Sequence, residues 1–324
     1  MNKLLVGDIG GTNSRFSLFS NKNNTLVLES ELWEKTNSFQ SFEELLHRIK
    51  ERDPRYDVNK VSTVTVAVPG AVTSDNVILL PYVRWAIDRG LLHERYPDAN
   101  IFIINDFVAQ AYGCLTQATA DALHILVGTG GQGQANQDIA IVGAGTGTGH
   151  GTLKRAEDGR YLSIPSEAGH IPFPFLSEDR EEASFRNFLL TEKKIISPVC
   201  NDVVSGPGIS RIYHFFTGKE LPASQVVQEL DAESETVKYF ARFYGRVCRN
   251  YALSTLASGG KLFISGGVTI KNPFLVDNES FRNEFLQSET TAKDLLQQID
   301  VFLIKDERIG LFGAAQYQWL VNLN

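Results

Sequence analysis

Two stretches of this sequence decide the fold: residues 4–13, LLVGDIGGTN, and residues 139–149, IAIVGAGTGTG. Each begins as a short apolar strand and enters a glycine-rich turn. Each is then followed by a segment, residues 15–20 or residues 151–153, that reads as a second strand. Because this strand–turn–strand unit occurs twice, about half a chain apart, we predict two related halves that arose by duplication.

The rest of the chain alternates predicted strands with predicted helices, which is typical of α/β folds. A capping box that starts at Ser41 predicts the beginning of one helix. Apolar side chains at helical spacing over residues 240–251 predict a long amphipathic helix, and a last helix should begin near Gly310. Further strands are predicted at residues 25–33, 61–68, 101–104 and 262–264.

Length and composition set the broad class. At 324 residues, with 43% hydrophobic and 21% charged residues, the chain is long enough for two globular domains. Its net charge is −7 and it has no basic run, so no nucleic-acid partner is expected. No apolar stretch reaches the roughly 20 residues of a membrane span, so no membrane partner is expected either.

The cysteines indicate a reducing compartment. Cys114, Cys200 and Cys248 are odd in number and far apart, without metal-ligand spacing. We therefore predict buried, reduced thiols, neither a disulfide nor a zinc site, and a cytoplasmic location.

The first glycine turn, residues 7–13, could bind phosphate. Glycine removes side chains, so that backbone N–H groups can approach phosphate oxygens. Thr12 and Asn13 add neutral donors, and Asp8 places a carboxylate where a phosphate-bound magnesium could lie. The alternative is a tight turn between two strands. A Walker loop is excluded because no Gly-Lys-Ser/Thr follows.

Two further glycine segments strengthen the phosphate interpretation. Residues 145–147 could hold the same phosphate chain, and Gly266-Gly267, after a strand, could let adenosine approach the backbone. Taken singly, the last pair could also be a plain strand–helix loop. Residues 128–133 spell Gly-x-Gly-x-x-Gly, but a polar segment follows where the dinucleotide fingerprint needs a helix, so we interpret them as a surface loop.

Polar side chains that could act on a hydroxyl group occur at two places in the chain. Asp106, after Asn105 at the end of a buried strand, could accept a proton or could cap the next helix. Glu167 and His170 could both hydrogen-bond sugar hydroxyls, although a lone histidine is more often structural.

These residues resemble, in order, the motifs of bacterial glucokinases, members of the hexokinase/actin-like sugar kinase superfamily. The motifs cover nearly the whole chain and lie at residues 8–13, 104–107, 143–147, 166–170, 205–208 and 265–267.

The resemblance implies a two-lobed actin/hexokinase-like (ribonuclease H-like) α/β fold with duplicated domains and an interlobe cleft. The small lobe would comprise residues 1–112 plus 307–324 and the large lobe residues 113–306. It also implies an ATP-dependent hexose kinase, with glucose as the first candidate. Such an enzyme transfers the γ-phosphoryl group to the sugar 6-hydroxyl, requires Mg²⁺, and is usually a homodimer.

The resemblance also assigns roles to single residues. Asp106 would be the catalytic base, and the sugar ligands would be Asn105, Asp106, Glu167 and His170. The nucleotide ligands would be Asp8, Gly10, Gly11, Thr12, Asn13, Gly145, Thr146, Gly266 and Gly267. Asp8 would also hold magnesium through water.

Two positions on the sugar side depart from the family pattern. Asn201 stands where the family has a second sugar-binding glutamate, and Tyr82 stands where it tends to have asparagine. An amide lacks the charge that makes a carboxylate a strong hydroxyl acceptor. The alternatives that stay open are a kinase for a different hexose, a phosphatase of the exopolyphosphatase type and a non-catalytic sugar sensor. A sensor of the repressor kind would need a DNA-binding module, which we do not expect here.

Overall fold

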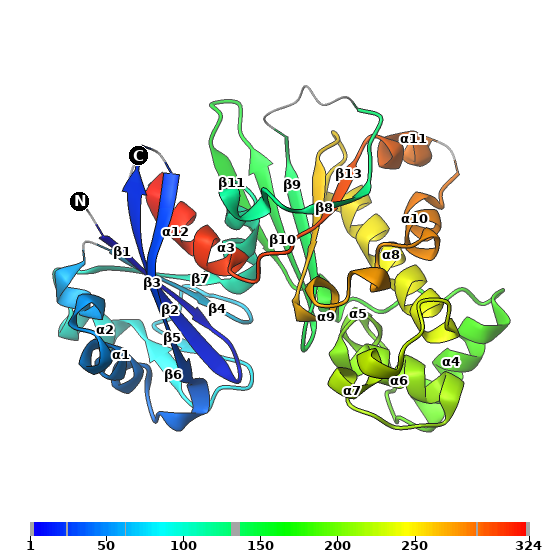
Figure 1. Cartoon of the computed structure of the whole chain (residues 1–324), viewed down its shortest axis with the longest axis horizontal. Helices are drawn as coiled ribbons and strands as arrows, with labels where there is room; N and C mark the ends of the chain where they lie inside the picture. The colour runs from blue at the N-terminus through cyan, green and yellow to red at the C-terminus, as the bar shows by residue number, and fades with distance from the viewer. Residues whose placement is uncertain (1–2, 24, 62, 131–136, 290, 322–324) are drawn as a thin grey trace. The chain divides into compact units, whose positions relative to one another are not determined.

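The computed structural model describes residues 3–23, 25–61, 63–130, 137–289 and 291–321. Its contacts divide the chain into two compact units, drawn in Figure 1. Unit 1 comprises residues 1–120 and 308–324, and unit 2 comprises residues 121–307. The lobe boundaries given by the resemblance, 1–112 with 307–324 and 113–306, stay a prediction.

Unit 1 is built on a five-stranded sheet with the order β3-β2-β1-β4-β7. Its strands are β1 (Lys3–Ile9), β2 (Asn13–Lys22), β3 (Thr25–Lys35), β4 (Thr63–Val68) and β7 (Asn100–Asn105). The first three pair antiparallel, whereas β1, β4 and β7 run parallel to one another. A separate two-stranded sheet joins β5 (Val77–Leu79) to β6 (Ala86–Asp88).

Helices cover both faces of this sheet. They are α1 (Phe42–Arg52), α2 (Arg89–Arg95), α3 (Asp106–Gly113) and α12 (Ile309–Val321). Leu45 and Ile49 of α1 join Phe16 and Leu18 of β2 in one core. On the other face α12 packs against α3, β1 and β4, and the Phe312 ring meets Phe19 edge-on with the centroids 5.1 Å apart (Figure 1).

Unit 2 repeats the strand pattern of unit 1. Its strands are β8 (Leu123–Leu126), β9 (Ile139–Ala144), β10 (Thr148–Arg155), β11 (Tyr161–Ser166), β12 (Lys261–Ser265) and β13 (Asp300–Leu303). The sheet order is β11-β10-β9-β12-β13-β8, with β9, β10 and β11 antiparallel and β9, β12 and β13 parallel. Apart from the added β8, this is the topology of unit 1, and the predicted duplication is confirmed.

The helices of unit 2 surround a long central one. They are α4 (Arg180–Thr191), α5 (Cys200–Val203), α6 (Gly206–Thr217), α7 (Ala223–Glu229), α8 (Glu235–Thr255), α9 (Gly267–Ile270), α10 (Glu279–Leu286) and α11 (Thr291–Gln297). Helix α8 packs against β9, α6 and α10, and its apolar side chains fill the core of the unit.

Short 3-10 helices occur in both units. They lie at Thr36–Ser38, Pro54–Tyr56, Val58–Lys60, Gln117–Thr119, Ala168–His170 and Pro273–Leu275.

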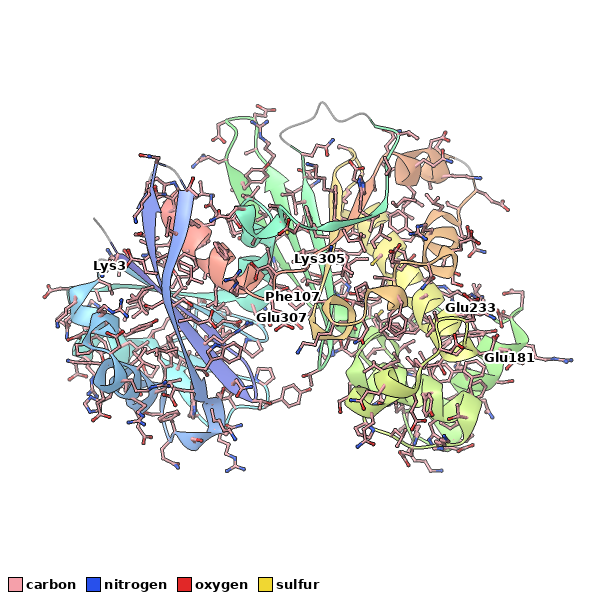
Figure 2. The ribbon with its side chains drawn as sticks, viewed as in Figure 1. Lys3, Phe107, Glu181, Glu233, Lys305 and Glu307 are labelled. Carbon is pink, nitrogen blue, oxygen red and sulfur yellow. The ribbon has the colours of Figure 1, made fainter. Side chains whose placement is uncertain are left out.

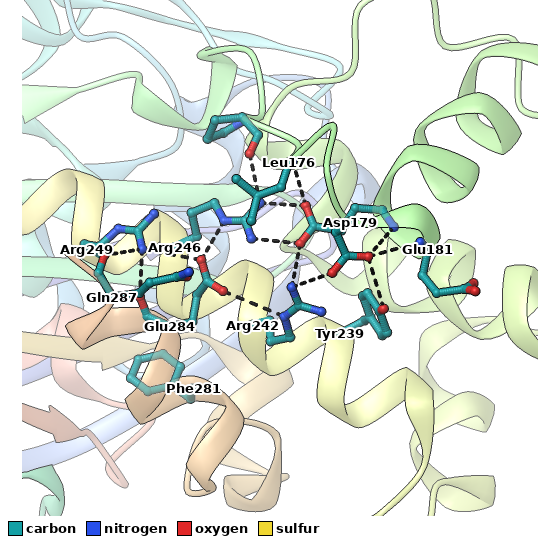
Figure 3. A network of polar contacts seen from close by, with 12 residues as sticks. Leu176, Asp179, Glu181, Tyr239, Arg242, Arg246, Arg249, Phe281, Glu284 and Gln287 are labelled. Atoms are coloured by element: carbon teal, nitrogen blue, oxygen red, sulfur yellow. Dashed lines mark hydrogen bonds and ion pairs between the residues drawn. The ribbon is translucent and has the colours of Figure 1, made fainter. Parts of the chain in front are cut away.

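A buried network of ion pairs ties α8 to α4 and α10 (Figure 3). Arg246 is 1% exposed and bonds both Glu182 (2.7 Å) and Glu284 (2.8 Å). Burial alone would lower the pKa of Arg246, but the hydrogen bonds to these carboxylates outweigh it and raise the pKa. Arg246 also donates to the carbonyl of Pro174 (2.9 Å), so the network holds the segment that follows the 3-10 helix Ala168–His170.

Most predicted elements are present, with small differences. Helix α1 begins after Ser41 as predicted, and Ser41 Oγ accepts from the N–H of Glu44 (3.1 Å). The reciprocal bond differs, because Glu44 accepts from the N–H of Gln40 instead of Ser41. The strand predicted over residues 61–68 is observed from Thr63.

Three other predictions concern the rest of the chain. The cysteines are buried as predicted. Of the surface loop predicted at residues 128–133, residues 131–133 lie outside the described residues. Every helix in the described part of the chain is too short or too polar to span a bilayer.

Candidate active site

Two carboxylates that the sequence predicted to be functional lie at the same edge of the unit 1 sheet, the edge where its parallel strands end. Asp8 lies near the end of β1, and Asp106 follows the end of β7. Strand β4 separates them, with Ala67 paired to Asp8 and Val68 paired to Asn105. Since β1, β4 and β7 are parallel, both carboxylates belong to the edge where α/β sheets bind ligands.

Two hydrogen bonds at Gly10 fix the backbone of the first glycine turn. The N–H of Gly10 donates to the carbonyl of Asn13 (3.0 Å), and the Thr36 hydroxyl donates to the carbonyl of Gly10 (2.7 Å). Thr12 and Asn13 are exposed at the tip of the turn. The turn therefore presents polar groups to solvent, while the hydrogen bond from Thr36 fixes its backbone at Gly10.

Asp8 is paired with Arg15, an interaction the sequence did not predict. Asp8 Oδ2 accepts from Arg15 Nη2 at 2.8 Å, and both side chains are 19% exposed. The Arg15 guanidinium also lies over the Trp33 ring, 5.0 Å from its centroid. Gly310 of α12 lies beside this carboxylate, and a Cβ added there would be in ordinary van der Waals contact with Asp8 Oδ2, at 3.7 Å. The carboxylate is thus fixed in direction.

Asn105, and not Asp106, caps helix α3. Asn105 Oδ1 accepts from the N–H groups of Phe107 (2.9 Å) and Val108 (3.1 Å), and Asn105 Nδ2 donates to the carbonyl of Gly70 (2.9 Å). Asp106 is the first helical residue, and its Oδ1 accepts from the N–H of Phe107 (3.0 Å). Figure 2 marks Phe107 at this helix start. The alternative that Asp106 is the N-cap is wrong.

Tyr82 lies against the first glycine turn in a strained conformation. Its φ is +64°, a region that non-glycine residues rarely adopt, and its side chain is 76% exposed. Asn37 Nδ2 donates to the carbonyls of both Gly11 (3.1 Å) and Tyr82 (3.0 Å), while Asn37 Oδ1 accepts from the N–H of Arg84 (3.0 Å). One amide therefore fastens the loop of Tyr82 to the turn.

Unit 2 brings together three polar side chains. Glu167 precedes the 3-10 helix Ala168–His170 and His170 is its last residue, with Glu167 Oε2 and His170 Nε2 3.8 Å apart. Asn201 Nδ2 lies 3.5 Å from His170 Nε2, and Asn201 Oδ1 accepts from the N–H of Thr148 (2.7 Å). A side chain at Gly169 would collide with Asn201 Oδ1 at 2.4 Å, so this close packing needs glycine.

The second and third glycine segments also meet in unit 2. Gly145 donates from its N–H to the carbonyl of Gly147 (2.8 Å), and its own carbonyl accepts from Gly206 at the start of α6 (2.8 Å). Gly266 has a φ of +90°, and a side chain there would lie 2.2 Å from the carbonyl oxygen of Ala144. Gly267 begins α9, where a side chain would meet open space, and Thr146 is exposed. The two turns thus form one glycine-lined surface.

Sequence reasoning missed Arg15 and Asn37. The antiparallel register pairs Arg15 with Asp8, so a known turn length between β1 and β2 would have found it. No signal in the sequence marks Asn37, because its three hydrogen bonds join segments far apart in the chain.

The described side chains could bind magnesium only together with the phosphates of a bound nucleotide. Among the described residues, no three His, Cys, Asp or Glu side chains are arranged so that they could hold a metal ion. Magnesium in kinases keeps several waters and uses one or two carboxylates together with substrate phosphates. The partly buried Asp8 carboxylate beside a turn of backbone N–H groups fits that mode.

Two α/β units of one topology, with glycine turns and carboxylates at strand ends, define the two-lobed class of the actin- and hexokinase-like phosphotransferases. A profile of the glucokinase family matches residues 5–319. A glucokinase of Nostoc punctiforme is 28% identical, over 97% of this chain and 98% of its own length.

Solved structures agree. The crystal structure of a glucokinase from an Antarctic psychrotroph is 26% identical, with a TM-score of 0.81 and 99% of both chains covered. A ROK family glucokinase from Streptomyces griseus, in complex with glucose and AMPPNP, has the same fold, with 16% identity, a TM-score of 0.62 and coverage of 98% of this chain and 99% of its own. The chain belongs to the glucokinase family, as the sequence predicted, and the predicted two-lobed α/β fold is confirmed.

Proposed function

We propose that this protein is an ATP-dependent hexose kinase that transfers the γ-phosphoryl group of ATP to the 6-hydroxyl of a hexose, with glucose as the first candidate. The observation that carries the proposal is the cluster of Glu167, His170 and Asn201 in a chain of the glucokinase family. A carboxylate, an imidazole and an amide in contact suit vicinal hydroxyls, which a phosphatase that uses water does not need to bind.

The residues of both units would share the reaction. Asp106 would accept the proton of the attacking hydroxyl, because its carboxylate stands at the sheet edge and is oriented by the N–H of Phe107. Asn105 would donate from its second amide N–H to the sugar, since Oδ1 and one N–H are already engaged. Glu167 and His170 would hold other hydroxyls.

Positioning and charge neutralisation would account for most of the rate, as in other phosphoryl transfers. The nucleotide would lie on the backbone of the glycine turns, with the phosphates at Gly10, Gly11, Thr12, Asn13, Gly145 and Thr146, and adenosine at Gly266 and Gly267. The N–H groups of Gly10 and Gly145 already donate within their own turns, so glycine at these two positions would serve close approach of the phosphates and not donation. Mg²⁺, when bound, would neutralise phosphate charge, and Asp8 would hold it through water.

A coupled assay of ATP consumption across glucose, mannose, fructose, galactose and N-acetylglucosamine tests the proposal. We expect sugar-dependent ADP formation that needs Mg²⁺ and has at least one hexose as a clear preference. ADP formation that does not depend on any sugar would indicate a hydrolase, and it would overturn the proposal.

The first prediction concerns the choice of hexose. Because Asn201 replaces a charged acceptor, we expect weak glucose affinity or a preference for another hexose. Losing such an acceptor costs about 1–3 kcal/mol, or roughly ten- to a hundredfold in affinity. Asn201→Glu should lower the KM for glucose by about that factor and leave the KM for ATP unchanged. Steady-state kinetics on both substrates measures this.

Two matched variants separate charge from other effects. Asn201→Gln has the length of glutamate without its charge and should not tighten glucose. Asp202 cannot replace the missing carboxylate as it stands, because Asp202 Oδ2 accepts from the N–H of Val199 (3.0 Å) and Oδ1 lies 3.5 Å from Arg211. Asp202→Ala should therefore leave glucose affinity unchanged. Tight glucose use by the wild type, unaltered by all three changes, would contradict the assignment of Asn201.

The second prediction concerns magnesium. Asp8→Ala should raise the Mg²⁺ concentration for half-maximal rate by about tenfold, since a charge-assisted contact is worth about 1.5–3 kcal/mol. Sugar binding should persist. Arg15→Gln is the control, because it breaks the 2.8 Å pair and keeps the Asp8 carboxylate. The measurement is the initial rate of each variant as a function of Mg²⁺ concentration. An equal rise in the half-maximal Mg²⁺ concentration in both variants would mean that Asp8 acts through Arg15 and not on the metal.

We also propose a homodimer in the cytoplasm. The family resemblance supports the dimer, and three buried cysteines are compatible with a reducing compartment. Sedimentation velocity at several protein concentrations measures the oligomeric state.

A further inference from the structure

A pocket in unit 2 is lined by none of the residues that form the glycine turns. It has a volume of about 480 Å³ and is bounded by β11, the segment from Ser166 to Pro174 and the C-terminal half of α8. This volume is within the range of roughly 300–1,000 Å³ of small-molecule sites. Glu167, His170 and Asn201 are not among the residues that line it, so the pocket is distinct from the proposed sugar site.

The lining specifies the chemistry of an occupant. It carries no Asp, Glu, Lys or Arg. His150 lines the pocket as a neutral ring, because burial lowers its pKa to about 4. A nucleotide or sugar phosphate would bring charge to a place without counter-charge, at a high desolvation cost. An uncharged molecule is therefore favoured.

Apolar side chains supply most of the contact surface. Ile164 and Ile171 line the pocket although they are 46% and 57% exposed, so an occupant would remove apolar surface from water. Asn250 and Ser254, one turn apart on α8, add polar groups to the wall. An amphipathic molecule fits better than a pure hydrocarbon.

The pocket wall is continuous with the proposed sugar ligands. Ser166 and Ala168 line the pocket on either side of Glu167, Ile171 follows His170, and Cys200 precedes Asn201. These wall segments are bonded to each other, because the N–H of Cys200 donates to the carbonyl of Ile171 (3.0 Å). An occupant that fixes the wall would therefore also fix the backbone that carries all three sugar ligands.

We propose that this pocket binds an uncharged, largely apolar small molecule and that its occupancy tightens the binding of the sugar. The second half of this statement rests on the proposed function. The mechanism is ordering: a filled pocket holds both wall segments in the arrangement in which Asn201 contacts His170, so sugar binding costs less ordering. We expect sugar affinity to rise about fivefold or more, the low end of typical coupling between sites.

The probe is prodan, an uncharged naphthalene dye whose emission changes when it leaves water. We expect saturable one-to-one binding by the wild type. Ser254→Trp, which fills the pocket from α8, should weaken binding at least tenfold. Ile196→Gln removes an apolar side chain that is 90% exposed but does not line the pocket, and it should bind prodan like the wild type. Binding that is not saturable, or that survives in Ser254→Trp, would overturn the pocket.

Calorimetric titration of glucose with and without saturating prodan tests the coupling. A fivefold gain in the wild type that is absent from Ser254→Trp supports it, and an unchanged affinity overturns it. If glucose does not bind even without dye, the proposed function is contradicted, and the coupling that rests on it is contradicted as well. The dye titration tests separately whether the pocket binds an uncharged molecule. Dye binding that disappears as the protein self-associates would assign this surface to a second copy of the chain, against the proposal.

Discussion

Asp106→Asn is expected to lower turnover by about 10²- to 10⁴-fold, the contribution of a well-placed general base. The variant keeps the shape of the side chain, and its amide oxygen can still accept from the N–H of Phe107, as Asp106 Oδ1 does at 3.0 Å. Helix α3 should be unaffected, because Asn105 is its N-cap. The affinity for ATP, measured by calorimetry, should therefore stay close to that of the wild type while steady-state turnover collapses.

A second carboxylate in the same unit provides the control. Asp88 caps α2 by accepting from the N–H groups of Gly90 (2.8 Å) and Leu91 (3.1 Å). Asparagine caps a helix about as well as aspartate, so Asp88→Asn should retain activity. Near-normal turnover of Asp106→Asn would show that another group accepts the proton or that none is needed.

Arg246→Met is expected to destabilise unit 2 by about 3–5 kcal/mol, the usual cost of removing one partner of a buried ion pair. Glu182 and Glu284 are 0% and 4% exposed, and each would lose its closest charged partner. Glu182 would keep Arg242 at 3.0 Å, and Glu284 would keep only the longer contacts with Arg242 (3.7 Å) and Arg249 (3.4 Å). The bond to the carbonyl of Pro174 would be lost as well. Urea unfolding followed by circular dichroism measures the change, and sugar KM reports on the segment that follows His170.

The matched control is an exposed pair. Arg160 and Asp158 are 61% and 49% exposed, and Arg160→Met should leave the unfolding curve in place because solvent screens such pairs. If Arg246→Met does not express as a folded protein, Arg249→Met provides the milder case. Arg249 lies at the edge of the network, where its Nη1 is 3.4 Å from Glu284 Oε1. Wild-type stability in both network variants would contradict the role given to these pairs.

The sequence predicted the framework because local patterns determine it. The apolar runs before the glycine turns become β1 and β9, and the similar order of strands in both sheets follows from the repeated strand–turn–strand unit. Ser41 and the helical spacing in α8 likewise act through near neighbours in the chain.

Contacts between distant segments could not be predicted in this way. Asn37 joins Gly11 to Tyr82, residues about seventy positions apart, and no local pattern marks it. Position alone left Asp106 open as base or cap, and only the hydrogen bonds of Asn105 removed the second possibility. The buried Arg246 looked like any charged residue of an amphipathic helix until α4 and α10 were placed beside it.

The central claim, sugar-dependent phosphoryl transfer from ATP, is tested most directly by phosphorus NMR of the protein with ATP, Mg²⁺ and glucose. The account predicts that ADP and a hexose 6-phosphate appear in equal amounts, with no inorganic phosphate beyond that of a protein-free sample, and that Asp106→Asn forms both far more slowly. Inorganic phosphate as the product, or intact ATP in the presence of glucose and of every other hexose of the panel, would contradict it.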